Sequence, residues 1–206
     1  MGRRLAAELL LRGHTVRGLA RPGSEGRLAP GCTSVIGDAL DSSSYRDALR
    51  QCDTLVHLVG VSHPSPAKAA QFRTLDLAGA LAAVAAARES GIAHFVYVSV
   101  AHPAPVMHEY IAARIEAETA IRASGLNATI LRPWYVLGPG RRWPIALLPA
   151  YWLMELLPPT RQSARRLGLV RWPRMIAALA AAVEHPASGI RVIEVPEIRK
   201  GLPPGD

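Results

Sequence analysis

The segment 92–140 restricts the fold of this chain more than any other part of the sequence. It opens with a run rich in β-branched and aromatic residues, IAHFVYVSV, which is typical of a buried strand that ends at Ser99. A helical stretch at 106–124 follows, and then a second apolar run at 128–131. A strand, a helix and another strand in this order predict two parallel strands joined by a crossover helix.

The same alternation continues along the chain and predicts an α/β fold with a parallel sheet and helices on both faces. We expect one domain over 1–196, in which 141–170 form a small cleft-covering subregion, followed by a loose tail at 197–206. Strands are predicted at 15–20, 33–37, 54–59, 94–99, 128–131 and 191–195. Helices are predicted at 3–12, 43–50, 67–90, 106–124, 144–157 and 173–184.

Composition agrees with a globular domain that has a sizeable core, since half of the 206 residues are hydrophobic. Cys32 and Cys52 lack CxxC or metal-ligand spacing, so we expect reduced core thiols of a cytoplasmic protein. The seven histidines show no HxxxH or HExxH spacing, and no metal site is predicted. The first leucines have the spacing of an amphipathic helix and not of a signal peptide.

Three side chains at or near the end of the strand 94–99 are candidate catalytic groups. Tyr110 and Arg114 lie four residues apart at the start of the helical stretch, so they share one helix face and can converge beside the strand that ends at Ser99. A hydroxyl, a phenol and a cation at strand carboxyl ends can transfer a proton next to a bound cofactor. A solvated arginine and a packing tyrosine are the alternative, and the residues alone leave both open.

The order of these motifs resembles the short-chain dehydrogenase/reductase superfamily. More narrowly, it resembles the atypical NmrA-like and NAD(P)H-binding branch, which includes the nucleotide-binding accessory subunit of respiratory complex I. In that superfamily a strand ending in Ser precedes a Tyr-x-x-x-Lys helix, and the next strand enters an Arg-Pro-x-x-hydrophobic-Gly-Pro-Gly loop, matched here by 132–140. The similarity covers roughly 2–195 and implies a Rossmann-like doubly wound sheet. Arg114 stands where the family usually has Lys.

The resemblance also implies that the chain starts late within the fold. Members open with a hydrophobic strand and a T-G-x-x-G-x-x-G loop, whereas this chain opens MGRRL, with Gly2 as the last glycine of the loop. The absent strand would lie at the centre of the sheet, and its loss would leave two unpaired ladders, exposed apolar faces and an incomplete phosphate cradle. We interpret this as a start codon assigned too late or a truncated gene, or as a fold adapted to the loss.

A basic residue follows the predicted strand 15–20 directly, where this fold meets the adenosine ribose. An acidic residue there would accept a hydrogen bond from the 2′-hydroxyl of NAD, whereas Arg21 suits the 2′-phosphate of NADP. We therefore expect NADP(H) rather than NAD(H). An exposed loop arginine without a ligand is the alternative.

The resemblance places further cofactor contacts at the ends of later strands. Asp38 would lie near the adenine amino group, or it would cap the helix that begins near residue 43. Val59 and Gly60 would line the adenosine side, with the glycine permitting close backbone approach, and Pro133 of the Arg-Pro loop would join the same site. Asp76 stands where the family often has Asn, and we expect it to stabilise its helix.

The implied function is an NADP(H)-dependent oxidoreductase, or an epimerase or dehydratase that uses the same cofactor. Hydride would pass between nicotinamide C4 and a carbonyl or alcohol carbon, and Tyr110 would exchange a proton with the substrate oxygen. Ser99 would hydrogen-bond that oxygen, while Arg114 would favour the phenolate and reach the nicotinamide ribose. Because Arg is planar and bulkier than Lys, the alternative is a non-catalytic NADP(H)-binding protein that senses redox state or stabilises a complex.

The net charge of +8 is concentrated near the C-terminal third, because 141–174 hold seven Arg against one acid. This is either a solvated basic face or a surface that attracts an anionic cofactor, an acidic substrate or a membrane. The apolar run 143–157 is too short to span a bilayer. It suits a helix that closes over the cleft, which implies an apolar small-molecule substrate, or an interfacial helix that gives 141–166 weak membrane contact. No nucleic-acid partner is expected.

Overall fold

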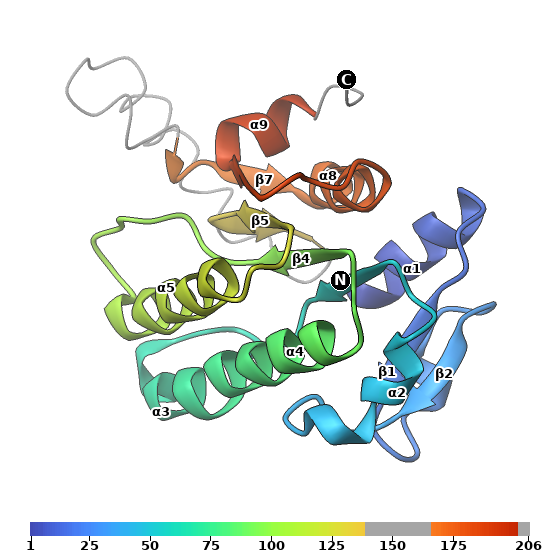
Figure 1. Ribbon diagram of the computed structural model, residues 1–206. Coiled ribbons are helices and arrows are strands. Elements are labelled where there is room, and N and C mark those ends of the chain that lie inside the picture. The colour runs from blue at the N-terminus through green and yellow to red at the C-terminus, as the bar shows by residue number, and fades with distance from the viewer. Residues whose placement is uncertain (139–165, 202–206) are drawn as a thin grey trace.

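The computed structural model describes residues 1–138 and 166–201, which form three layers (Figure 1). A parallel sheet of four strands forms the middle layer, in the order β3-β4-β5-β8. Its strands are β3 (Thr54–His57), β4 (His94–Val98), β5 (Ala128–Arg132) and β8 (Ile190–Glu194). Helices α4 (Ala78–Glu89) and α5 (His108–Ala123) cover one face, and α1 (Gly2–Leu11), α8 (Trp172–Glu184) and α9 (Val195–Lys200) cover the other. The predicted α/β fold with a doubly wound parallel sheet is confirmed.

The two faces of the sheet explain why its central strands are apolar throughout. Phe95 and Tyr97 of β4 enter the core beneath α4 and α5, whereas Val96 between them enters the core beneath α1 and α8. All three side chains are fully buried. A strand buried on both faces needs a continuous apolar run rather than an alternating one, which is the pattern of HFVYV.

A second, separate sheet contains β1 (Arg17–Ala20) and β2 (Thr33–Ile36), which are parallel and paired with each other. Within residues 1–138 and 166–201, no strand pairs with both β1 and β3. The expected interruption of the sheet between these strands is therefore present. Leu19 and Ile36 of this small sheet remain 36% and 44% exposed, so its apolar faces are only partly covered.

The helix predicted over 67–90 is divided into several pieces. A 3-10 turn η3 (Pro66–Lys68) and a short helix α3 (Ala69–Gln71) precede the π-helix η4 (Phe72–Leu77), and only then does α4 begin. The wider π turn buries Phe72 and Asp76 on the side of η4 that faces α5. A single π turn inside a helix is frequent at functional sites.

Other boundaries differ from the predictions in small ways. The helix predicted at 43–50 consists of η2 (Ser42–Ser44) and α2 (Arg46–Leu49), and η1 (Glu25–Arg27) is a short turn that was not predicted. The parallel pair β6 (Tyr135–Leu137) and β7 (Leu169–Arg171) was not predicted either. The helix predicted at 144–157 lies outside the described residues.

The loose tail was predicted to begin at residue 197, but residues 197–200 belong to helix α9. The prediction is wrong for these residues. Glu194 and Glu197 form a capping box at the start of α9, in which the Glu194 amide donates to the Glu197 carboxylate at 2.9 Å. Val195 and Ile198 of the helix are fully buried, so packing adds to the cap. Cys32 and Cys52 are free thiols and both are half-buried, and Cys52 packs against the core beneath α4 and α5. No helix in the described part of the chain is both long and apolar enough to cross a bilayer.

A buried histidine ends β3. His57 is 5% exposed and its ring stacks on Phe95 and Tyr97, with centroids 6.5 and 5.9 Å away. Its Nε2 has no hydrogen-bond partner. Burial, together with the nearby charge of Arg114, lowers the pKa of His57 to about 3. The folded protein therefore holds this ring neutral.

The neutral His57 predicts a loss of stability in mild acid. Below pH about 6.5 the unfolded chain binds a proton here that the folded chain does not bind, so the free energy of unfolding falls as the pH is lowered. From pH about 6.5 to about 4.5 the loss should approach about 2 kcal/mol. His57→Phe keeps an aromatic ring that cannot titrate. Urea unfolding at both pH values should show the parent losing more than the variant, and equal losses would contradict the assignment.

Candidate active site

The site lies where parallel strands end and helices begin. The first turn of α1 is close to the end of β3, because a Cβ built on Gly2 would lie 3.8 Å from Leu58 Cδ1. No side chain caps the N-terminus of α1. Free amide groups at a helix N-terminus beside the carboxyl ends of parallel strands suit a phosphate group. The predicted role of Gly2 in binding the pyrophosphate of a dinucleotide stays a prediction.

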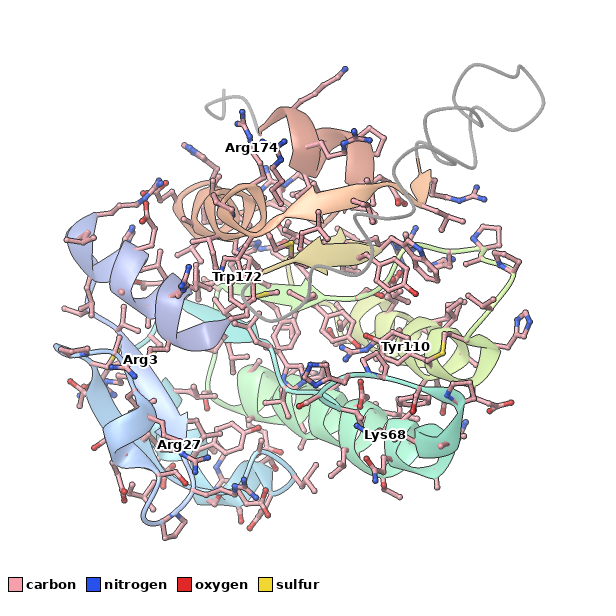
Figure 2. All side chains as sticks on the ribbon, turned by 180° about the vertical axis from the view of Figure 1, so that it is seen from behind. Arg3, Arg27, Lys68, Tyr110, Trp172 and Arg174 are labelled. Carbon is pink, nitrogen blue, oxygen red and sulfur yellow. The ribbon has the colours of Figure 1, made fainter. Side chains whose placement is uncertain are left out.

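Tyr110 lies in the first turn of α5, on the side of the molecule shown in Figure 2. It is half-buried, and Phe72 meets its ring edge-on with centroids 5.1 Å apart. The ring also forms part of the wall of an open pocket of about 280 Å³. Besides Tyr110, the pocket is lined by Pro66, Ala69, Phe72, Met107, His108 and Glu109. Its wall is mainly apolar, so it suits a hydrocarbon group next to a phenol.

Arg114 lies against Tyr110, with its Cζ 5.2 Å from the centre of the phenol ring. The two side chains therefore converge as their spacing predicted. Arg114 is 6% exposed, and its guanidinium forms an ion pair with Asp76, which is fully buried. It also donates to the Val98 carbonyl at 2.8 Å and to the Tyr97 hydroxyl at 3.3 Å. Arg114 is thus bound to protein groups in addition to its contact with Tyr110.

Burial raises the pKa of Tyr97 to about 12, against the opposing charge of Arg114. The Tyr97 phenol therefore stays protonated over the physiological range and can accept from the guanidinium. Sequence reasoning did not single out Tyr97 or the ionic role of Asp76. The available signal for Asp76 was an acid inside a predicted helix otherwise rich in Leu and Ala.

Ser99 takes part in a different network. Its side chain is buried, and its hydroxyl donates to Glu118 Oε1 at 2.6 Å. Glu118 also accepts from Arg132 Nε at 2.9 Å, and Arg132 Nη1 donates to Glu194 Oε1 at 2.9 Å. Glu118 lies eight residues after Tyr110, or about 12 Å along the helix axis. The hydrogen bond that the structure gives the Ser99 hydroxyl is therefore to Glu118, and its predicted substrate contact stays a prediction.

Glu118 is the main residue of this network that the sequence did not reveal. Burial acts to raise the pKa of Glu118, but hydrogen bonds from Arg132 and Ser99 outweigh it and hold the pKa below its ordinary value. His102 approaches the same carboxylate, with Nε2 3.6 Å from Oε1. The signal in the sequence was its spacing, since Glu118 follows Arg114 by four residues on a helix that packs on the sheet.

The predicted cofactor residues occupy the ends of several strands. Arg21 directly follows β1 and is exposed. Asp38 is exposed too, and its Oδ1 accepts from the Leu40 amide at 3.0 Å. The carboxylate that caps η2 belongs to Asp41, so the capping alternative for Asp38 is wrong and only its adenine role stays open. Val59 is 39% exposed.

Gly60 and Pro133 are the other two predicted cofactor residues. A Cβ built on Gly60 would collide with Arg114 Nη2 and lie 2.9 Å from Asp76 Oδ1. The close approach that this glycine permits is therefore made by the buried ion pair. Pro133 is buried, and its carbonyl accepts from the Ala101 amide at 2.9 Å. Among residues 1–138 and 166–201, no group of three or more His, Cys, Asp or Glu side chains is placed to hold a metal ion.

The Glu118 network predicts a large difference between two glutamates on the same helix. Removing the charge in Glu118→Gln leaves the half-buried Arg132 with Glu194 alone as its carboxylate partner among the described residues, which should lower the free energy of unfolding by about 2 kcal/mol. Glu116→Gln removes an exposed pair with Arg73 and should cost less than about 1 kcal/mol. Urea unfolding of both variants at neutral pH measures the difference. Equal losses would show that the buried network does not stabilise the fold.

Comparison with known proteins places this geometry in a family. The sequence profile of a family described as NAD(P)H-binding matches residues 1–142. The curated protein named ceramide reductase, from Caulobacter vibrioides, is 25% identical over 166 residues, which are 81% of this chain and 51% of that protein. The chain thus spans about half the length of this curated relative.

Solved structures share the fold at low sequence identity. The enzyme WbmH of Bordetella bronchiseptica in complex with NAD+ superposes with a TM-score of 0.66 at 20% identity, covering 92% of this chain and 70% of that one. The dTDP-glucose 4,6-dehydratase DesIV of Streptomyces venezuelae, with NAD and TYD bound, gives 0.67 at 22% identity and covers 93% and 71%. A short-chain dehydrogenase/reductase superfamily protein of Agrobacterium tumefaciens with bound NAD gives 0.67 at 19% identity and covers 94% and 74%.

These structures show the Rossmann-like fold of NAD-binding dehydrogenases in this chain. The profile match extends over more than half of the sequence, from the first turn of α1 to beyond the end of β6. The chain belongs to the NAD(P)H-binding family.

Proposed function

We propose that this chain is an NADP(H)-dependent oxidoreductase that acts on an apolar carbonyl or alcohol substrate. The observation that carries the proposal is the position of Tyr110, whose ring is packed against a buried cation and lines an apolar pocket. The family and the fold supply a nicotinamide cofactor at the neighbouring strand ends. A phenol between a cofactor site and an apolar pocket is placed to exchange a proton with a bound substrate.

The chemistry follows from the phenol and its neighbours. A reduced nicotinamide bound at the strand ends would supply a hydride to the carbonyl carbon. Tyr110 donates its proton to the carbonyl oxygen, so that the carbonyl becomes an alcohol, and the phenolate is reprotonated from water. Arg114, whose guanidinium lies against the ring, holds the phenol in place meanwhile. In the oxidation direction the proton and the hydride travel the opposite way.

The apolar character of the substrate rests on the pocket. Phe72, Met107 and Pro66 contribute hydrocarbon surface beside the Tyr110 ring. Burying such surface against a ligand is favourable by about 25 cal/mol per Å². Ceramide, in the name of the Caulobacter relative, is a lipid, and this agrees with an apolar substrate.

The preference for NADP(H) rests on charge at the end of β1. Arg21 is exposed there, and Arg17 and Arg21 are the charged residues between His14 and Gly23. A guanidinium binds a phosphate in two parallel hydrogen bonds, and a 2′-phosphate would lie beside this strand end. The segment from His14 to Gly23 contains no acidic residue that would accept a hydrogen bond from the 2′-hydroxyl of NAD.

A second candidate function is a non-catalytic NADP(H)-binding protein that senses redox state or stabilises a complex. Two observations favour it: Ser99 donates to Glu118, and Arg114 is paired with Asp76. Ser99, the predicted partner of the substrate oxygen, is therefore already bonded to another residue of the protein. The same holds for Arg114, the predicted partner of the nicotinamide ribose. The two functions differ in turnover and agree in cofactor binding.

Tyr110→Phe tests the catalytic proposal. Loss of the proton donor should lower kcat for NADPH-dependent carbonyl reduction by about a hundredfold or more, since general acid catalysis contributes that much. NADPH affinity, measured by cofactor fluorescence, should be unchanged, and Tyr45→Phe, which alters a tyrosine near η2, serves as the matched control. If the parent protein binds NADPH but reduces none of a panel of aliphatic and aromatic aldehydes and ketones, the second function replaces the first.

Arg21→Ala tests the cofactor preference. Removing a charge-assisted contact with the 2′-phosphate should weaken NADPH binding by about tenfold or more, while NADH binding stays unchanged. Arg88→Ala is the control, because Arg88 is exposed in the last turn of α4. That turn leads to the amino end of β4, away from the carboxyl ends of the strands. Equal weakening of NADPH and NADH by Arg21→Ala would overturn the preference.

A further inference from the structure

The feature that goes furthest beyond the predicted site is the ion pair between Arg114 and Asp76. Both side chains are buried, at 7% and 0% exposure, and among the described residues Asp76 is the carboxylate that pairs with this guanidinium. A buried charge needs a counter-charge and hydrogen bonds on its remaining polar atoms. The neighbours of the pair supply most of them.

The pair joins four segments of the chain. Asp76 belongs to η4, and its Oδ2 accepts from the Val61 amide at 2.9 Å, in the loop that follows β3. Arg114 belongs to α5 and donates to the Val98 carbonyl at the end of β4. The ion pair also fills the space beside Gly60, so that no side chain fits at that position. A displacement of either charge would therefore be transmitted to the loop, the π-helix and the strand end.

The same pair holds the predicted catalytic phenol. The guanidinium lies between two tyrosine rings, with Cζ 5.6 Å from the centre of Tyr97 and 5.2 Å from the centre of Tyr110. A cation over an aromatic face is attracted to it. On its other side Tyr110 meets Phe72, which belongs to the same π-helix as Asp76. Asp76 thus acts on Tyr110 by fixing Arg114.

We propose that Asp76 is a positioning residue of this site, which acts with Arg114 as one charge-neutral unit to hold Tyr110 at the wall of the apolar pocket. This inference rests on the proposed function for its effect on turnover. It assigns to Arg114 a task that a lysine would not perform equally, because one ammonium group lacks the planar fork that binds Asp76 and Val98 while stacking on Tyr110.

A double-mutant cycle tests the unit. Asp76→Asn and Arg114→Gln should each lower kcat for NADPH-dependent carbonyl reduction between about tenfold and a hundredfold, as expected for a misplaced catalytic group. Because the two residues act together, the double variant should lose about as much as the worse single variant. In Asp76→Asn the loss should fall on kcat, with NADPH affinity unchanged. Losses that multiply in the double variant would overturn the proposal.

A control cycle uses the exposed pair of Arg73 and Glu116, which also joins η4 to α5 at 3.1 Å. Arg73→Gln, Glu116→Gln and their combination should leave kcat unchanged. A loss comparable to that of Asp76→Asn would show that any link between these two elements matters, and would overturn the specific role of the buried pair.

A readout independent of turnover separates this inference from the proposed function. Nitration of Tyr110 by tetranitromethane, followed by peptide mass spectrometry, reports how firmly the phenol is held. It should be faster in the double variant, which removes both charges together, than in the parent, while the buried Tyr45 should react slowly in both. Unchanged nitration of Tyr110 would overturn the inference even if turnover is absent. Should Asp76→Asn be too unstable to purify, the double variant, which leaves no unpaired buried charge, supplies the comparison.

Discussion

A buried positive charge is the constraint on which the site depends. Arg114 stays ionised at any physiological pH, so the fold must supply a counter-charge inside the core, and Asp76 on the π-helix does so. The wider turn of that helix places the carboxylate where a loop amide and the guanidinium can both reach it. Glycine at position 60 then follows from the space that the pair occupies.

A second ionic network lies at the same end of β4. Ser99 donates to Glu118, which pairs with Arg132 of β5, and Arg132 also reaches Glu194 at the end of β8. This network joins three neighbouring strand ends to α5. Two networks therefore fix α5 against the sheet at two positions one helical turn apart, Arg114 and Glu118. A helix anchored in this way presents Tyr110 in a defined orientation, as a site built on a rigid element requires.

The sequence predicted the layers of the fold because the cause is local. The run HFVYV is apolar on both faces, and such a strand needs helices on both sides of the sheet. It did not predict the π-helix at 72–77, since a wider turn depends on what packs beneath it. Helix α9 was also missed, because its N-cap residue is Glu194 and glutamate is not among the residues that usually cap a helix.

The sequence by itself determined the α/β class, the parallel order of the main strands and the helical spacing that brings Tyr110 and Arg114 together, because periodicity is a property of neighbouring residues. Only the tertiary structure decided which acids pair with which cations. Asp76 and Arg114 are 38 residues apart, and Arg132 and Glu194 are 62 apart. Such partners are chosen by the need to neutralise each buried charge, and that need arises only once the layers have packed.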